Sequence, residues 1–453
     1  MNQIIISQSH WKKLQNHLLQ DQNEHLAFFY ANNYFNGDGT TFLVKDLVLV
    51  SDDSLDNGFW SLNLSTEKLL EIINKAKLEN LALIEAHSHP FSNKNVAFSG
   101  TDLDGFKEFV PYVQSSLSKP YAGLVLGKNS VAGLCWIDTL DNKKLDRIVI
   151  IGEKYKIQSL TSDQKSYDKT VLDKYKRHSI FGNEVQKQLG KLKVAVVGLG
   201  GIGSHVVQQL AYLGVRNFIL IDFDNVEKSN LNRLIGAFPS DIYKSKAEIA
   251  EHLICSICDD ENVNIEKFTC ELNDPTVLNS LKTTDFIFGC LDNDGGRLIL
   301  NEFSRAFLKP YLDCGVGINP INEKLTEIGG RIVFVKPDSP CLQCAGEINN
   351  TEAMHFFQTD EEKKINKKLG YVQNFDVPSP SVVTLNGVVS SVATTEFFLY
   401  IVGKKRSFYL NYDANSQRLT ERIIKKDDNC YACSLQGLGL SAEILERYRK
   451  RNF

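Results

Sequence analysis

Two histidines, a serine and an aspartate near residue 90 have the types and spacing of a metal-dependent hydrolase site. His87 and His89 end an apolar run in the sequence EAHSHP, and Ser99 and Asp102 open a helical pattern. Two histidines separated by one residue at a strand end point to the same side, and Asp102 can complete the set of zinc ligands. Three ligands leave one position for water, which predicts a catalytic rather than a structural metal.

Such a site also needs an acid that takes a proton from water. Glu24, which starts the apolar run EHLAFF, is the candidate general base, and Glu85 is the alternative. A histidine pair alone is more often a structural feature. The complete set of polar residues favours a working site.

A glycine-rich loop directly follows the apolar run Lys193–Gly198 (KVAVVG). Gly198, Gly200 and Gly203 form the pattern G-x-G-x-x-G, and Gly201 is a fourth glycine within it. They let the backbone turn tightly and aim a helix N-terminus at a phosphate. Asp222, at the end of the next apolar run, suits a ribose hydroxyl. Taken alone, the pattern fits a dinucleotide oxidoreductase or a glycine turn used for packing.

Charged and polar residues beyond Asp222 favour a triphosphate and magnesium over a nicotinamide cofactor. They follow the ends of apolar runs: Asp224, Asn230, Arg233, Lys246 and Asp292. Ligands of open α/β sheets bind at the carboxyl ends of the strands, so we expect Asp292 at the same edge as Asp222. Surface salt bridging could explain any one of these charges but explains the ordered set poorly.

Two C-x-x-C pairs lie near the C-terminus, Cys341 with Cys344 and Cys430 with Cys433. Each turn can present two thiolates on one side, so the pairs suit a closed tetrahedral zinc site. The gap between them is longer than in a zinc ribbon, and a redox-active pair is the alternative.

The elements that must position these residues form an α/β protein. Residues 1–152 are predicted to be a mixed α/β domain, residues 153–172 a polar linker and residues 173–453 a doubly wound domain with a parallel sheet. In the first domain, strands are expected at Leu26–Ala31, Phe42–Val50, Leu81–His87, Tyr121–Leu126 and Val131–Ile137, and helices at Thr66–Glu79 and Asp102–Leu117.

In the second domain, a helix should end at Leu213, strands should cover Phe218–Asp222 and Asp285–Cys290, and a helix should cover Gly295–Leu308. Residues 345–377, rich in Glu, Lys and Asn, are predicted to be an exposed excursion.

The composition is that of a globular protein. With 453 residues, the chain should hold two or three domains, and its net charge of −4 gives no sign of a nucleic-acid or membrane-surface binder. The first residues predict no signal peptide, and the apolar stretch Val392–Val402 is too short to span a bilayer. We therefore expect a cytoplasmic protein whose ten cysteines are thiols or metal ligands.

Several of these motifs together resemble the ThiF/MoeB-like superfamily, the fold of ubiquitin-activating enzymes and sulfur-carrier adenylyltransferases. The matching pieces are GLGGIGS, DFDNVEKSNLNR, Lys246 and CLDN. Upstream, Tyr175-Lys176-Arg177 resembles the family's R-Y-x-R-Q sequence, although Lys174 and His178 stand where the family has Arg and Gln.

The resemblance implies that ATP adenylates the C-terminal glycine of a small ubiquitin-like or sulfur-carrier protein. It implies Asp222 and Asp224 near the nucleotide, with Asp222 on the ribose, and Asp292 on Mg²⁺. Asn230, Arg233 and Lys246 would bind phosphates. Arg177 would reach the ATP of a neighbouring subunit, so a homodimer is expected. The four cysteines would hold a structural Zn²⁺.

A cysteine that could carry the activated protein as a thioester is missing from the expected place. Residues 345–429 contain no cysteine, and Leu385 occupies the position where one would stand. Five other cysteines lie in apolar patterns and are expected to be buried: Cys255, Cys258, Cys270, Cys290 and Cys314. We therefore predict adenylation without thioester formation.

The N-terminal set resembles the JAMM (JAB/MPN) zinc metalloproteases, which cleave isopeptide bonds to ubiquitin and its relatives. The resemblance covers a strand-borne Glu, H-x-H-P and S-x-x-D, with a longer loop, Phe91–Phe98, between the last two. It implies that His87, His89 and Asp102 hold a catalytic Zn²⁺ and that Ser99 stabilises the oxyanion.

The joint hypothesis is an activator and a protease for one carrier, in a bacterial ubiquitin-like modification pathway such as antiphage defence, with a conjugating enzyme as a further partner. One alternative is sulfur-carrier activation for cofactor or thio-metabolite synthesis. A second alternative is that the N-terminal domain is a binding module without catalytic activity.

Overall fold

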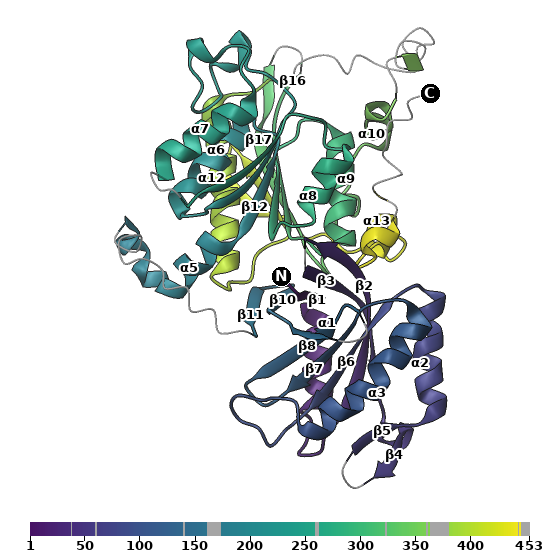
Figure 1. Cartoon of the computed structure of the whole chain (residues 1–453). Helices are drawn as coiled ribbons and strands as arrows, with labels where there is room; N and C mark the ends of the chain where they lie inside the picture. The colour runs from purple at the N-terminus through teal and green to yellow at the C-terminus, as the bar shows by residue number, and fades with distance from the viewer. Residues whose placement is uncertain are drawn as a thin grey trace. The chain divides into compact units, whose positions relative to one another are not determined.

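The structure is a computed structural model that describes residues 1–37, 39–58, 61–138, 141–160, 174–258, 262–321, 324–358, 361–362, 380–442 and 444. The chain divides into two compact units, which we treat separately (Figure 1). Unit 1 contains residues 1–165, 306–308 and 435–442, and unit 2 contains residues 166–305, 309–434 and 443–453.

Unit 1 is built on a nine-stranded sheet with the order β11-β10-β1-β3-β2-β6-β7-β8-β9. The strands are β1 (Gln3–Ser7), β2 (Leu26–Asn36), β3 (Gly39–Leu49), β6 (Ala82–Ser88), β7 (Tyr121–Leu126), β8 (Val131–Trp136), β9 (Asn142–Lys144), β10 (Arg147–Ile151) and β11 (Tyr155–Ser159). A separate hairpin joins β4 (Leu55–Gly58) to β5 (Ser61–Leu64).

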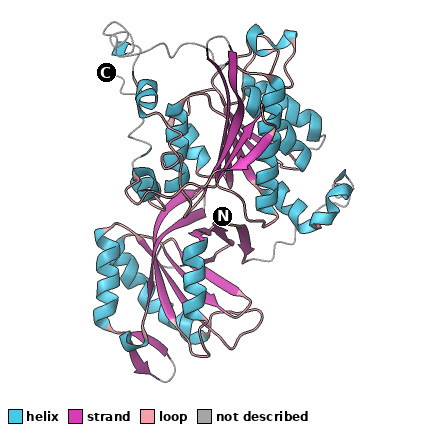
Figure 2. Cartoon of the chain, turned by 180° about the vertical axis from the view of Figure 1, so that it is seen from behind, coloured by secondary structure: helices cyan, strands magenta, loops and turns pink. Residues whose placement is uncertain are grey.

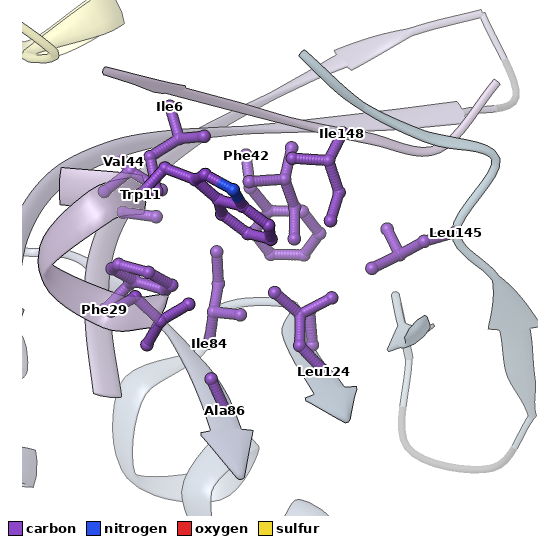
Figure 3. Packing of buried hydrophobic residues seen from close by; sticks show 14 of the residues in the cluster. Ile6, Trp11, Phe29, Phe42, Val44, Ile84, Ala86, Leu124, Leu145 and Ile148 are labelled. Carbon is purple, nitrogen blue, oxygen red and sulfur yellow. The ribbon is translucent and has the colours of Figure 1, made fainter. Parts of the chain in front are cut away.

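Helices cover both faces of this sheet, because alternate strand residues supply apolar side chains to each face. On one face, α1 (Gln8–Leu18) places Trp11 beside Phe42 in a cluster that also contains Ile84 and Ala86 (Figure 3). On the other face, α2 (Thr66–Leu78) and α3 (Gly100–Leu117) pack against residues such as Leu83. The side chains of Glu85 and His87, which alternate with Ile84 and Ala86 along β6, therefore lie on the face that α2 and α3 cover.

The predicted strands and helices of residues 26–137 are confirmed, with ends that differ by a few residues. The predicted linker is wrong in part, because Tyr155–Ser159 forms β11 and pairs antiparallel with β10. Only Tyr155 of this strand is fully buried, so its polar sequence gave no strand signal. The short elements β1 and α1 were not predicted.

A segment from the far end of the chain, residues 435–442, belongs to unit 1. The side-chain amide of Asn32 on β2 donates a hydrogen bond of 2.9 Å to the carbonyl oxygen of Gly437. Gly437 has a φ of +76°, and a Cβ there would lie 2.8 Å from the carbonyl oxygen of Val44. Only glycine fits this close approach of two backbones. The structure thus differs from the prediction that residues 173–453 form one domain.

Unit 2 is built on an eight-stranded sheet with the order β14-β13-β12-β15-β16-β17-β18-β19. The strands are β12 (Lys193–Val197), β13 (Asn217–Ile221), β14 (Asn264–Phe268), β15 (Phe286–Gly289), β16 (Tyr311–Ile321), β17 (Lys324–Val335), β18 (Tyr409–Asp413) and β19 (Arg418–Glu421). The first five in spatial order run parallel, and β17, β18 and β19 extend the sheet in antiparallel pairs.

Helices lie on both faces of the unit 2 sheet (Figures 1 and 2). One face carries α6 (Gly201–Leu213), α7 (Lys246–Cys258) and α12 (Val383–Ile401), and the other carries α8 (Pro275–Leu281) and α9 (Asp294–Ala306). This arrangement confirms the predicted doubly wound α/β fold. The apolar stretch Val392–Val402 lies almost entirely in α12. In the part of the chain that the structure describes, no helix is long and apolar enough to cross a bilayer.

The predicted exposed excursion, residues 345–377, is wrong at its start. Ala345 and Ile348 are buried, and α10 (Asn350–Phe356) buries Ala353. The polar composition concealed these widely spaced apolar positions. Residues 359–360 and 363–377 lie outside the described residues.

Candidate functional sites

Three parallel strands of unit 2 end side by side, as the sequence predicts. Val197 at the end of β12 pairs in register with Ile221 of β13 and with Gly289 of β15. The backbone N–H of Gly198 donates to the carbonyl of Ile221 at 2.9 Å, and that of Cys290 donates to Val197 at 2.8 Å. The glycine loop, Asp222 and the residues after β15 therefore share the carboxyl edge of one sheet.

The glycine loop has the close backbone contacts that its sequence predicts. Gly198 has a φ of +86°, and a Cβ at Gly203 would lie 1.9 Å from the carbonyl oxygen of Gly198. A Cβ at Gly201 would lie 2.2 Å from the side-chain nitrogen of Asn386. At Gly200 a Cβ would meet no described atom within 4 Å. The loop is therefore tight inside and open at Gly200, beside the N-terminus of α6.

Asp222 connects this loop to the turn after β13. Its carboxylate accepts hydrogen bonds from the backbone N–H of Leu199 at 2.6 Å and of Asp224 at 2.9 Å. Burial raises the pKa of Asp222 above its ordinary value, and the charge of Lys246 partly opposes that rise. The Nζ atom of Lys246 lies 2.6 Å from Asp224. The structure thus brings Asp222, Asp224 and Lys246 together.

Arg233 and Asn230 make local hydrogen bonds. Arg233 donates to the carbonyl oxygen of Ser229 at 2.7 Å, and a Cβ at Gly201 would lie 3.6 Å from its Cδ. Arg233 therefore lies beside the glycine loop. The side-chain oxygen of Asn230 accepts the backbone N–H of Glu227 at 3.1 Å, which caps the 3-10 helix η3 (Lys228–Asn230). Phosphate binding by Asn230 remains a prediction.

Asp292 is exposed just after β15, so its carboxylate is free to approach a ligand. Arg297, which sequence reasoning missed, donates to the carbonyl oxygen of Leu291 at 2.9 Å and to Asp294 at 2.8 Å. It also lines a pocket of about 680 Å³. Other residues around that pocket include Gly315, Gly317, Gly330, Arg331 and Asn411. The position of Arg297 shortly after the CLDN sequence was the signal by which sequence reasoning could have found it.

Arg177 lies in the 3-10 helix η2 (Lys176–Phe181) and is exposed. The preceding Tyr175 is buried and accepts a hydrogen bond of 2.8 Å from Arg216. This contact fixes the start of η2 on unit 2. Action of Arg177 in a neighbouring subunit remains a prediction.

The four cysteines of the two C-x-x-C pairs converge. In the second pair, Cys433 lies in α13 (Tyr431–Ser434) and Cys430 directly precedes that helix. Their ligand atoms lie within 4.8 Å of one another, and Cys341 Sγ is 3.5 Å from Cys430 Sγ. Arg305 donates to Cys433 Sγ at 3.6 Å, and the backbone N–H of Asp427 donates to Cys344 Sγ at 3.5 Å. Donors aimed at sulfur favour thiolates, so the cluster fits a tetrahedral Zn²⁺.

The remaining cysteines are only partly as predicted. Cys258 and Cys314 are buried, but Cys270 and Cys290 are partly exposed and Cys255 is exposed. The prediction is wrong for Cys255, because the buried stripe of α7 runs through Ile254 and Cys258 and leaves the next position in solvent. Leu385 is buried on α12.

In unit 1, His87, His89 and Asp102 converge at the end of β6 and the start of α3. The Nε2 atoms of both histidines lie 3.5 Å from Asp102 Oδ2, and the three ligand atoms lie within 4.8 Å of one another. Among the described residues, the buried Nε2 of His87 has no hydrogen-bond partner. These two nitrogens and one oxygen, of which His87 Nε2 is buried and unpaired, form a set of ligands that fits a Zn²⁺ ion.

The electrostatics of this set are those of an ion pair. Burial lowers the pKa of His87, but the carboxylates of Asp102 and Glu85 outweigh it and raise that pKa to about 9. Burial likewise raises the pKa of Asp102, but His87 and the backbone of Ser99 hold it at about 2. Zinc would replace the proton on His87 as the positive partner of Asp102.

Ser99 caps α3. Its Oγ accepts the backbone N–H of Asp102 at 3.1 Å, and its own N–H donates to the Asp102 carboxylate at 2.6 Å. The capping box explains why the helix begins here. The hydroxyl hydrogen of Ser99 stays available as a donor.

The two candidate bases lie on opposite sides of the histidines. Glu24, two residues before β2, has Oε1 3.6 Å from His89 Nε2 and a side chain that is 37% exposed. Glu85 instead lies 3.5 Å from Nδ1 of His87, on the side away from the ligand atoms. Because only Glu24 reaches the ligand side, the geometry favours Glu24 as the base and Glu85 for another role.

Comparisons with known proteins concern mainly unit 2. The ThiF family profile matches residues 174–432. The chain is 31% identical over 182 residues to the SAMP-activating enzyme E1 of Haloferax volcanii, with 40% of the chain and 63% of that enzyme covered. The chain thus spans less than two thirds of that relative. It is 26% identical over 294 residues to ubiquitin-like modifier-activating enzyme 5 of Xenopus laevis, covering 62% of the chain and 68% of that protein.

Among solved structures, E. coli MccB with succinimide is similar at 20% sequence identity and a TM-score of 0.45. The similarity covers 57% of the chain and 74% of that structure.

Proposed function

The chain belongs to the ThiF family, and from this premise we propose that it uses ATP to adenylate the C-terminal carboxylate of a small ubiquitin-like carrier protein. The observation that carries the proposal is the shared strand edge, where the open glycine loop, the Asp224–Lys246 pair and Asp292 meet. Two relatives are named as activating enzymes for SAMP and for ubiquitin-like modifiers, which supports this substrate class.

In this reaction a carboxylate oxygen of the carrier attacks the α-phosphorus of ATP. The bond from that phosphorus to the pyrophosphate oxygen breaks, and an acyl-adenylate and pyrophosphate form. The amides at the start of α6, with Arg233 and Lys246, would neutralise the phosphates, and Asp222 would bind the ribose. Asp292 would hold Mg²⁺, which supplies charge neutralisation for the departing pyrophosphate.

The pocket that Arg297 lines suits the carrier's C-terminal tail. Gly315 and Gly317 lie on β16 and line it, and a Cβ at Gly317 would meet no described atom within 4 Å. An extended peptide can therefore approach the strand backbone closely. Arg297 lines this pocket and donates to the carbonyl oxygen of Leu291, the residue before Asp292, so we place the tail carboxylate at this end.

Carrier-dependent exchange of radiolabelled pyrophosphate into ATP tests the adenylation. Asp292→Ala should abolish the exchange and leave the fold intact, whereas Asp428→Ala, at an exposed aspartate of the same unit, should exchange like the wild type. Exchange by Asp292→Ala at the wild-type rate would refute the magnesium assignment. Ubiquitin-like and sulfur-carrier proteins tested in parallel separate the two substrate classes.

A second function is favoured by the convergence of His87, His89 and Asp102 in unit 1. We infer a zinc peptidase that releases or trims the same carrier. A zinc ion bound by these residues would supply Lewis-acid activation of water. Glu24 would take the proton from that water and pass it to the departing amine, and Ser99 would donate to the oxyanion.

Cleavage of a carrier fused at its C-terminus, measured together with zinc content, tests this second activity. Glu24→Ala should keep the zinc and lose cleavage, whereas His89→Ala should lose both. If the wild type binds no zinc at this site, or if Glu24→Ala cleaves as the wild type does, unit 1 is a binding module.

A further inference from the structure

Glu85 is a partly buried carboxylate on a largely apolar face of the sheet. Leu83, Tyr121 and Trp136 lie on the same α3 side of the sheet, in one cluster with Phe106. Ile84 and Ala86, its neighbours in sequence, point into the opposite core (Figure 3). The side chain of Glu85 is only 17% exposed, and burying a carboxylate in such surroundings costs free energy. Packing alone would be served better by an apolar residue.

Two groups contact the carboxylate from opposite sides. The hydroxyl of Tyr121 donates to Glu85 Oε2 at 2.8 Å, and Nδ1 of His87 lies 3.5 Å from Glu85 Oε1. Tyr121 is fully buried, and burial with the nearby Glu85 charge raises its pKa well above the ordinary value, so it remains a donor. In the described part of the chain, His87 is the basic side chain recorded within 4.0 Å of Glu85.

We infer that Glu85 and Tyr121 form a positioning pair that fixes the tautomer and the ring orientation of His87 for metal binding. This inference rests on the proposed zinc site. An Nδ1–H donated to Glu85 leaves the lone pair on Nε2, the atom that faces Asp102 and has no other partner among the described residues. Carboxylates behind metal-bound histidines act in this way and raise the basicity of the ligand.

The strand geometry explains why this pair can position the ring. Glu85 and His87 are two residues apart on β6, so their side chains are neighbours on one face. Tyr121 begins β7, which runs parallel to β6, with Leu83 as its register partner. A phenol on the adjoining strand therefore holds the carboxylate in place, and the carboxylate holds the imidazole. His89 shows no such arrangement in the described residues: its recorded acidic neighbours, Asp102 and Glu24, both face Nε2.

Zinc affinity, measured by competition with a chelator, tests the inference. The site is isolated by subtracting the zinc that the His89→Ala protein retains. Glu85→Leu should lower the affinity about 10- to 100-fold. Glu85→Gln can still accept from Nδ1–H, so it should recover most of that loss. Tyr121→Phe should fall between the two, and Glu108→Gln, at an exposed glutamate of α3, should bind zinc like the wild type.

Thermal unfolding of the zinc-free proteins provides the folding control, because the apolar Glu85→Leu variant is expected to be at least as stable as the wild type. If folded Glu85→Leu binds zinc as tightly as the wild type, the positioning role is wrong while the zinc site stands. If the wild type retains no more zinc than His89→Ala, the proposed zinc site itself fails.

Discussion

The two candidate active sites are assembled in different ways. In unit 1, the three proposed metal ligands, the proposed base and the proposed oxyanion donor come from the end of β6, the start of α3 and the residues before β2, and the ligand atoms lie within 4.8 Å of one another. In unit 2, the candidate residues follow the ends of separate strands, Asp292 is exposed, and Lys246 pairs with Asp224. The fold of unit 1 already brings its candidate residues together, whereas we propose that the substrates complete the site of unit 2.

The same difference separates the two candidate metal sites. The His87–His89–Asp102 set has three ligands and lies on elements that the large sheet and two cores already hold. The four-cysteine cluster joins two loops whose contacting cysteines are 89 residues apart in the chain. A closed set of four thiolates contributes to folding, and an open set of three ligands serves chemistry. Loss of metal should therefore affect the two units differently.

The largest effect is expected at the four-cysteine cluster. Cys430→Ser combined with Cys433→Ser should destabilise unit 2 by about 5–10 kcal/mol, which approaches the whole stability of an ordinary domain. Calorimetry should show an early transition for unit 2 and an unchanged transition for unit 1. Cys255→Ser is the control, because that side chain is exposed. An unchanged unit 2 transition in the double variant would show that the cluster is not a structural metal site.

Next in size is the separation of the two activities. His87→Ala should reduce carrier cleavage to the uncatalysed background, because one of three zinc ligands is lost. It should leave pyrophosphate exchange within about twofold of the wild type, since the exchange site lies on other elements. Asp292→Ala should give the reverse pattern. Loss of both activities in a folded His87→Ala protein would break the comparison, because the two sites would then depend on each other.

Features that depend on local pattern were largely predictable from the sequence. The spacing of His87 and His89 sets their common side because strand side chains alternate, and the glycine loop is predicted by the strand that precedes it. Features that depend on distant segments were missed. Arg297 lines a pocket whose walls include the β16–β17 hairpin, and residues 435–442 pack on strands about 400 positions earlier. No window of sequence contains both partners of such contacts.

A smaller effect is expected from mixing defective subunits of unit 2. If Arg177 acts on the ATP of a neighbouring copy, an equal mixture of Arg177→Ala and Asp292→Ala chains forms mixed dimers with one competent site each. If subunits mix at random, about a quarter of the wild-type rate of pyrophosphate exchange should return. Each variant alone is the control. No recovery, when mixed dimers are demonstrated by a size or affinity tag, would mean that Arg177 does not act across subunits.

The smallest effect is expected from the cysteines outside the four-cysteine cluster. Cys290 is partly exposed at the strand edge beside the glycine loop, and its Cβ would lie 3.5 Å from a Cβ placed at Gly203. Among these cysteines, Cys290 is therefore the one to test for attack on an acyl-adenylate. Its backbone pairs with Val197, and its side chain interacts with the buried Cys314 thiol, whose pKa is raised well above the ordinary value by that hydrogen bond and by burial. This is the environment of a packing residue rather than of an activated thiolate. Cys290→Ala should therefore change carrier-dependent exchange by less than about twofold.

Incubation of the wild type with ATP and carrier should yield no adduct that a reductant removes, when the products are separated on a denaturing gel with and without thiol. An adduct that is present in the wild type and absent from Cys290→Ala would establish a thioester at the edge of the sheet, and the second site would then carry its own nucleophile.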